Sequence, residues 1–397
     1  MFLIFSFLIS ILVTWKLSRL LLNIDSLILW DLHAYFLIIL TILSVTQITF
    51  LKKISLSHTL IYFLIFLSVI GIVVRFLFYS NFEYVFVVNY LLPIFGFFYG
   101  RLLILKKNDF EIEKFFFIIF SIIIILNFLD YLSANNLIYT VFDRSIISDL
   151  RNEFGRGYAS TFGNADLPIL NIIVKRPQGI SFSPYASASL ILAIAIYFFY
   201  NSNYLKKTGL FLGILSLILS LIYAVGTIYL VLLIVVFISL KGVLHRLIYL
   251  PIFIFISVNI LYFKQVQQIA TFLIDMIENI MENSSYLMPL LFTGGGDKAY
   301  HLVTGEIYLF NLIFIIGAFG FLILIALIFL AAKNSNKISE DINSNLENID
   351  TNYFMPLFII FISSIHYNTL FQYPNALVFF FLLGCIDAKV IKGRKSE

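Results

Sequence analysis

Long apolar runs dominate this sequence, each unbroken over roughly 15–25 residues, which is enough for a helix to cross a lipid bilayer. Of the 397 residues, 61% are hydrophobic and only 12% are charged. A soluble domain is about 45–50% apolar and about 25% charged. The runs also lack the alternation over about 10 residues that a membrane β-barrel shows. The chain is therefore predicted to be an integral membrane protein built of helices, and a water-soluble enzyme is excluded.

We expect an all-α, polytopic fold with about twelve transmembrane helices. The run 208–240 is divided at Gly226, because glycine weakens a helix. The run 1–15 is interpreted as a retained span, since no basic residue precedes it and no small-residue cleavage site ends it. If it does not span, eleven helices remain and the N-terminus lies outside. The candidate spans are 1–15, 27–50, 58–79, 84–105, 115–133, 181–200, 208–222, 226–240, 246–263, 306–332, 353–371 and 374–390.

The positions of the basic residues predict the orientation, because Lys and Arg collect in cytoplasmic loops. With both termini in the cytoplasm, most of the 26 Lys and Arg residues fall inside, although Lys16 and Arg19 do not. The long segments 134–180 and 264–305 are then periplasmic loops, and the polar segment 333–352 is a cytoplasmic loop. No cytoplasmic segment is long enough for a nucleotide-binding domain, so we expect any chemistry on the outer face.

The first outer loop is rich in arginine, whose planar guanidinium makes paired hydrogen bonds to phosphate oxygens. Arg176 directly precedes a span that opens with Ser181-Phe182-Ser183-Pro184-Tyr185, which places it at the depth of the lipid headgroups. Its alternative role is to anchor that helix to lipid phosphates. The residues predicted to bind a diphosphate from this loop are Arg144, Arg151, Arg156 and Arg176.

The second outer loop ends in Thr293-Gly294-Gly295-Gly296-Asp297-Lys298. Backbone N–H groups of the glycines, together with Lys298, could bind phosphate, although a flexible loop is the simpler interpretation. His301 and Glu306 follow at the start of a span and are candidates for the base that accepts a proton from a sugar hydroxyl. His366 and Tyr185 are candidate pocket residues at outer span ends.

The second outer loop also contains an apolar stripe at helical spacing. We interpret it as a helix that lies on the outer membrane surface or closes over a cavity, or else as a helix packed on the bundle. The stripe consists of Ile269, Phe272, Leu273, Met276, Ile277, Ile280 and Met281.

The sequence predicts no metal site and no cofactor. The outer loops lack the Asp-x-Asp or Glu-x-Asp pair that commonly holds Mg²⁺ in sugar-phosphate transferases, and zinc protease and serine hydrolase motifs are absent. The single cysteine, Cys385, excludes a disulfide framework. We also predict no nucleic-acid partner.

Three features together resemble the bacterial O-antigen polymerase and ligase group. The first is Arg176-Pro-Gln-Gly179-Ile-Ser-Phe-Ser-Pro184 entering a span. The second is Gly305-Glu306-Ile-Tyr-Leu-Phe-Asn311-Leu with Gly317-Ala-Phe-Gly320 in the span after the second outer loop. The third is the pair of nearly continuous spans at 208–240.

This resemblance implies a glycosyltransferase of lipopolysaccharide biosynthesis in the bacterial inner membrane. The implied substrate is an undecaprenyl-diphosphate-linked oligosaccharide, and a chain-length regulator protein is an implied partner beside membrane lipid. Two large outer loops favour a polysaccharide polymerase over an O-antigen ligase or a related exopolysaccharide transferase. A lipid-linked oligosaccharide flippase or other transporter is the alternative from another class. It is disfavoured because no internal repeat is evident and paired charges are few in the spans.

Overall fold

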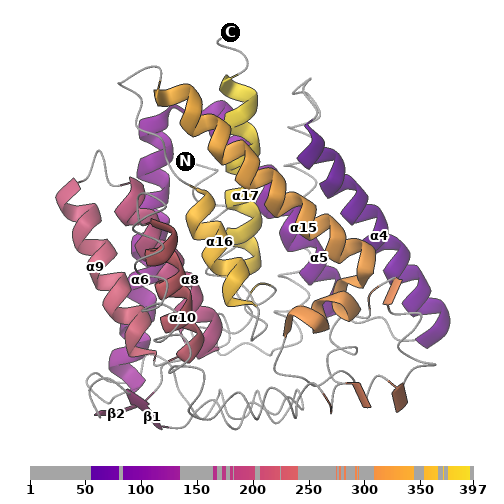
Figure 1. Ribbon diagram of the computed structural model, residues 1–397, viewed down its shortest axis with the longest axis horizontal. Helices are drawn as coiled ribbons and strands as arrows, with labels where there is room; N and C mark the ends of the chain where they lie inside the picture. Colours follow the sequence, from indigo (N-terminus) through magenta and orange to yellow (C-terminus); the bar gives the residue numbers. More distant parts are fainter. Residues whose placement is uncertain are drawn as a thin grey trace.

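The computed structural model describes a helical bundle and one small β-ribbon (Figure 1). The described residues are 55–79, 84–134, 164–167, 172–175, 179–181, 183–201, 206–223, 225–239, 308–343, 353–364, 370 and 374–393, with isolated positions between 274 and 294. The helices are α4 (Leu56–Tyr79), α5 (Tyr84–Lys106), α6 (Asp109–Ala134), α8 (Pro184–Asn201), α9 (Lys206–Ile222), α10 (Gly226–Ser239), α15 (Tyr308–Asn343), α16 (Phe354–Ser363) and α17 (Asn375–Gly393).

The predicted helical fold is confirmed, and it contains candidate membrane-spanning helices. Within the described residues, three helices are long and apolar enough to cross a membrane: Phe110–Leu132, Pro184–Asn201 and Ile316–Ser335. In lipid the backbone must satisfy its own hydrogen bonds, which is why such runs become helices. The predicted spans 58–79, 84–105, 208–222 and 374–390 correspond to the helices α4, α5, α9 and α17. The predicted spans 1–15, 27–50 and 246–263 lie outside the described residues.

The described bundle is helical as predicted, with one small β-ribbon in addition. Strands β1 (Asn164–Leu167) and β2 (Ile172–Lys175) form an antiparallel pair in which Asn164 lies opposite Lys175. This ribbon falls in the first predicted outer loop and was not predicted from the sequence. A two-stranded pair needs only short extended segments, so it leaves a weak signal beside the long apolar runs.

The bundle has two distinct ends (Figure 1). We call the lower one the ribbon end, since it carries β1, β2 and the first turn of α8. We call the upper one the opposite end, where α5 and α17 finish. Helices α8 and α17 are buried along most of their length, and they form the core of the bundle.

Helices α5 and α17 pack closely because both carry glycine at the contact. A Cβ on Gly100 would overlap the Phe381 carbonyl, and a Cβ on Gly384 would overlap the Phe97 carbonyl. Small residues at such a crossing let two backbones approach, as is common between membrane helices. The Tyr99 ring lies 5.9 Å from the Phe381 ring and fills the space beside the crossing.

The outer helices expose apolar side chains. On α15, Leu322 is 62% exposed and Phe329 is 68% exposed, and on α9 Phe211 is 63% exposed. Large apolar side chains on the surface of a helical bundle are typical of contact with lipid. The apolar character of these faces agrees with membrane insertion.

Two helices differ in extent from the predicted spans. Helix α15 continues to Asn343, well into the segment predicted as a polar cytoplasmic loop, and it is interrupted at Gly317. Helix α16 ends at Ser363, earlier than the predicted span 353–371. The helix α15 continues through polar residues beyond its apolar part, because a helix outside the apolar core can be solvated on all sides.

Candidate functional site

Only one of the residues predicted to form the site lies within the described part of the chain. Tyr185 occupies the first turn of α8, half-buried, with its ring packed against the hydrophobic core. The structure thus places it at the start of the predicted span. The other candidates, which lie outside the described residues, are Arg144, Arg151, Arg156, Arg176, Lys298, His301, Glu306 and His366.

The ribbon end contains a buried polar network around Gly179, Ile180 and Ser181. These residues follow Arg176 closely in sequence, within the motif Arg176–Pro184 singled out above. The Gly179 N–H donates to Asp130 Oδ2 at 2.7 Å, and the Ile180 N–H donates to Asn127 Oδ1 at 3.3 Å. Both acceptors are side chains of α6, so this helix holds the backbone of Gly179 and Ile180.

Gly179 is required by its conformation and by its surroundings. Its φ is +64°, in the left-handed region that residues with a Cβ rarely adopt. A Cβ would also overlap Asn127 Oδ1 and Ser187 Oγ, and it would lie 2.5 Å from the Tyr223 oxygen. The glycine in this motif therefore allows the backbone to approach three polar side chains from three parts of the fold.

Asn127 is the centre of the network. It is fully buried, and its Oδ1 also accepts a hydrogen bond from the Tyr223 hydroxyl at 2.8 Å. Its Nδ2 donates to the Ile123 carbonyl at 2.7 Å, which fixes the orientation of the amide. Burial raises the pKa of the Tyr223 phenol well above its ordinary value, and the charge of Asp130 raises it further. Tyr223 therefore keeps its proton and acts as a donor.

Ser181 connects the same segment to α17. Its N–H donates to Ser187 Oγ at 3.2 Å, and its hydroxyl donates to Asn375 Oδ1 at 3.2 Å. Asn375 Nδ2 in turn donates to the Ala186 carbonyl at 2.9 Å. All of these side chains are buried. The first turns of α8 and α17 are thus joined at the ribbon end.

The start of α8 follows from its sequence. Ser183 Oγ accepts from the Ala186 N–H at 3.5 Å, and Pro184 occupies the first helical position. Serine before the first turn and proline within it are preferred at helix N-termini. The network and this cap together fix the direction in which the chain enters α8.

Arg176 is bounded in sequence by two placed residues. Lys175 ends β2, where it pairs with Asn164, and Gly179 is held by Asp130. The acceptors of the network bind backbone N–H groups and the hydroxyls of Tyr223 and Ser181. These hydrogen bonds fix the backbone at Gly179 and Ser181, a few residues after Arg176 in the sequence. Sequence analysis missed Asn127, Tyr223 and Asn375 because they come from distant parts of the chain.

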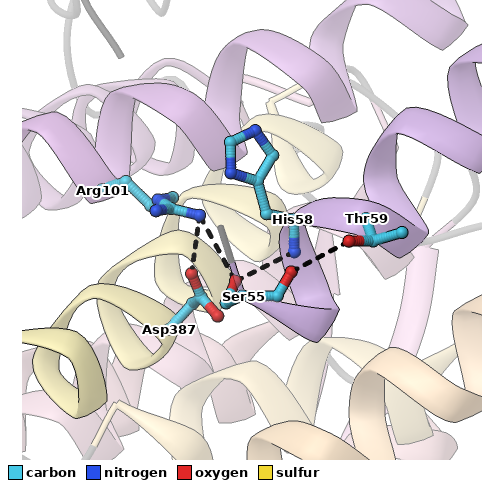
Figure 2. A network of polar contacts seen from close by, with 5 residues as sticks. All are labelled: Ser55, His58, Thr59, Arg101 and Asp387. Atoms are coloured by element: carbon cyan, nitrogen blue, oxygen red, sulfur yellow. Dashed lines mark hydrogen bonds and ion pairs between the residues drawn. The ribbon is translucent and has the colours of Figure 1, made fainter. Parts of the chain in front are cut away.

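A second buried polar cluster lies at the opposite end (Figure 2). The Arg101 guanidinium Nη1 lies 3.0 Å from Asp387 Oδ2 and donates to Ser55 Oγ at 3.3 Å. Ser55 Oγ also accepts the His58 N–H at 3.1 Å, which caps the start of α4. Three helices therefore meet at one arginine.

Arg101 is a buried cation inside the predicted span 84–105. Its side chain is fully buried within α5, and Asp387 is also buried within α17. Asp387 is an acidic residue in the largely apolar span 374–390, and such residues usually face the bundle interior and are paired. The sequence shows an acidic residue at Asp387, but it does not show that Arg101 is its partner.

His58 is buried beside this cluster, and its ring lies 4.6 Å from the Tyr62 ring and 5.2 Å from the Phe98 ring. Within the described part of the chain, neither ring nitrogen has a hydrogen-bond partner. Aromatic packing is therefore the interaction that the structure provides for this imidazole.

The described residues contain no group of three or more His, Cys, Asp or Glu side chains placed to hold a metal ion. Comparison with protein-family models, with curated proteins and with solved structures finds no match to this chain.

Proposed function

We propose that this protein is a polysaccharide polymerase of the bacterial inner membrane. It joins undecaprenyl-diphosphate-linked oligosaccharide repeat units on the periplasmic face by glycosyl transfer without a metal ion. The observation that carries the proposal is the buried network that fixes Gly179 and Ser181. These residues belong to the motif that begins at Arg176, and buried hydrogen bonds hold their backbone in place.

The proposed orientation agrees with the distribution of lysine over the described helices. Lys106 ends α5 and Lys107 follows it directly, Lys392 lies at the end of α17, and Lys207 lies at the start of α9. The ends of α5 and α17 and the start of α9 lie away from the strands β1 and β2 (Figure 1). Basic residues collect on the cytoplasmic side, which supports a periplasmic ribbon end.

The reaction breaks the bond between the anomeric carbon of the growing glycan and its lipid diphosphate. The leaving diphosphate takes the electron pair, and a hydroxyl of the incoming repeat unit forms the new bond to the anomeric carbon. Arg176 neutralises the charge that develops on the diphosphate. His301 or Glu306 accepts the hydroxyl proton. A single displacement inverts the anomeric centre.

The test compares Arg176→Ala and Arg176→Lys with Lys207→Ala as a control. Lys207 is an exposed basic residue at the opposite end. If Arg176 binds the diphosphate, both of its variants lose about 10²-fold in rate, since lysine keeps the charge but loses the paired hydrogen bonds. The control retains full activity.

The measurement is the growth of glycan on purified lipid-linked repeat units, with a membrane immunoblot to verify protein level. Normal chain growth by Arg176→Ala at normal protein level would reduce Arg176 to a lipid anchor. Transfer that occurs only onto an acceptor without lipid diphosphate would identify a ligase instead of a polymerase.

A further inference from the structure

The segment around Ile277, in the second predicted outer loop, carries apolar side chains that the protein leaves exposed. The described positions between Ile274 and Glu282 are helical. Ile274, Ile277 and Met281 are 56%, 49% and 71% exposed. Their spacing of three and four residues places them along one side of the helix. We call these three side chains the apolar edge.

Two acidic residues adjoin the apolar edge. Glu278 and Glu282 are exposed, and their spacing of four residues places them on one side of the helix. Each directly follows a residue of the apolar edge, Ile277 or Met281. Since successive residues of a helix point about 100° apart, the acidic side lies next to the apolar edge and not within it. Such a helix can insert one side into lipid while the other remains in water.

This helix lies across the direction of the bundle. Figure 1 shows its described pieces in a row along the lower edge of the molecule, at the level of β1 and β2, whereas α4 and α6 rise towards the opposite end. The apolar span of α6 ends at Leu132, also at the ribbon end. The helix is therefore placed where the membrane surface meets the bundle.

Exposed apolar side chains continue from this outer segment onto α15. The ring of Phe292, which is 55% exposed, lies 6.4 Å from the ring of Phe319, which is 50% exposed. Phe319 belongs to the apolar span Ile316–Ser335, in which Phe329 is also exposed. A Cβ on Gly317 would lie 2.6 Å from the Phe292 carbonyl oxygen, so the segment contacts α15 at the start of this span. Lipid that covers α15 therefore also reaches the outer segment.

The exposure of the apolar edge distinguishes between the roles expected for this segment. A helix packed on the bundle or closing over a cavity would bury its apolar stripe, whereas Ile277 and Met281 of that stripe are exposed. The remaining members of the stripe, which lie outside the described residues, are Ile269, Phe272, Leu273, Met276 and Ile280.

We propose that this segment is an interfacial helix of the outer leaflet. The apolar edge inserts among lipid acyl chains, and Glu278 and Glu282 face water. Because both acidic side chains would be repelled by anionic headgroups, insertion depends on apolar contact and does not require anionic lipid. The inference is independent of the proposed polymerase function.

Spin labels on the full chain in phosphatidylcholine vesicles test the proposal. Single cysteines replace Ile277 and Met281, and Glu278→Cys and Glu282→Cys are the matched controls on the adjacent side. The native Cys385 is fully buried and is not labelled. Collisions with oxygen, which concentrates in lipid, are compared with collisions with a water-soluble nickel chelate. The ratio of oxygen to nickel collisions should be severalfold higher at the two apolar positions than at the two controls.

A charge added to the apolar edge should release the helix from lipid. In the Met281→Cys protein, Ile274→Asp together with Ile277→Asp should lower the ratio to that of the controls. Glu278→Gln together with Glu282→Gln should leave the ratio at Met281→Cys high. The same result is expected when phosphatidylglycerol is added to the vesicles.

Three results would overturn the inference. Frequent nickel collisions at Ile277→Cys and Glu278→Cys alike would place the apolar edge in water. Few collisions with either reagent at Ile277→Cys would show that protein covers it. A high ratio that appears only with phosphatidylglycerol would show that attraction to anionic headgroups, and not apolar contact, holds the helix.

Discussion

Arg101 and Asp387 form an ion pair at 3.0 Å although their side chains are only 0% and 3% exposed. The same guanidinium nitrogen reaches Ser55, so the pair joins α5 and α17 to the start of α4. Removing two charges from water costs about as much as their attraction returns. The pair therefore specifies how these three helices meet more than it adds to net stability.

Removal of one partner should be far more damaging than removal of both. Asp387→Ala leaves the Arg101 charge buried without its carboxylate, and we expect a loss of about 3–5 kcal/mol in the free energy of unfolding. The double variant Arg101→Met, Asp387→Leu should recover most of that loss. Thermal unfolding in detergent measures the difference.

The exposed pair Lys107–Glu111 provides the control, since its atoms are also 3.0 Å apart but its side chains are 34% and 44% exposed. Glu111→Ala should leave the unfolding temperature unchanged, because solvent screens an exposed pair. Equal effects of Asp387→Ala and Glu111→Ala would contradict the structural role of the buried pair.

The close crossing of α5 and α17 leads to a second prediction. Gly384→Ala introduces a Cβ that overlaps the Phe97 carbonyl, and backbone cannot give way as a flexible side chain can. We expect a loss of about 1–3 kcal/mol or more, as is typical when a tight contact is overfilled. Size-exclusion chromatography in detergent should show less monodisperse protein. Gly320→Ala, which meets only a side chain of its own helix, should elute as the parent does.

The buried network at the ribbon end gives a graded prediction. Tyr223→Phe removes one hydrogen bond to Asn127 and should cost about 1 kcal/mol. Gly179→Ala should cost more, because it combines a left-handed φ with overlap of Asn127 and Ser187. Glycan polymerisation should fall in the same order, since both changes disturb the segment that follows Arg176.

A second tyrosine tests whether polymerisation depends on where the lost hydroxyl lies or only on the loss of a tyrosine hydroxyl. Tyr229 donates its hydroxyl to the Leu221 carbonyl at 3.0 Å, outside the network. Tyr229→Phe should lose a similar amount of stability but retain polymerisation. If Tyr229→Phe and Tyr223→Phe reduced polymerisation equally, the network would have no special role in positioning Arg176.

The helices were predictable because lipid leaves the backbone few alternatives. The break between α9 and α10 also lies beside Gly226, where the sequence suggests a division. The break at Gly317 was not predictable in this way, because membrane helices often contain glycine without interruption. It depends on Phe292 and Gly294, which reach the helix from another segment.

For the candidate site too, the sequence identifies local features but not the contacts between distant parts of the chain. The motif that begins at Arg176 draws attention to Gly179 from the sequence alone. The partners that explain this glycine, Asn127 and Tyr223, lie in α6 and between α9 and α10, and neither stands out among apolar neighbours. Arg101 lies near the end of the predicted span 84–105, where a basic residue usually marks the cytoplasmic side. Its partner Asp387 is distant in sequence, so the pair becomes apparent only in the fold.

The last prediction concerns orientation, on which the proposed periplasmic reaction depends. The only native cysteine, Cys385, is fully buried and should not react with an impermeant maleimide. Single cysteines can therefore be added without removing it, at Glu282 and at Thr208, both of which are exposed. Lysines at the opposite end place Thr208 in the cytoplasm by the positive-inside rule. In intact spheroplasts, Glu282→Cys should be labelled at once and Thr208→Cys only after permeabilisation. The reverse pattern would place the opposite end in the periplasm, and a chain inverted in this way could not present Arg176 to periplasmic repeat units.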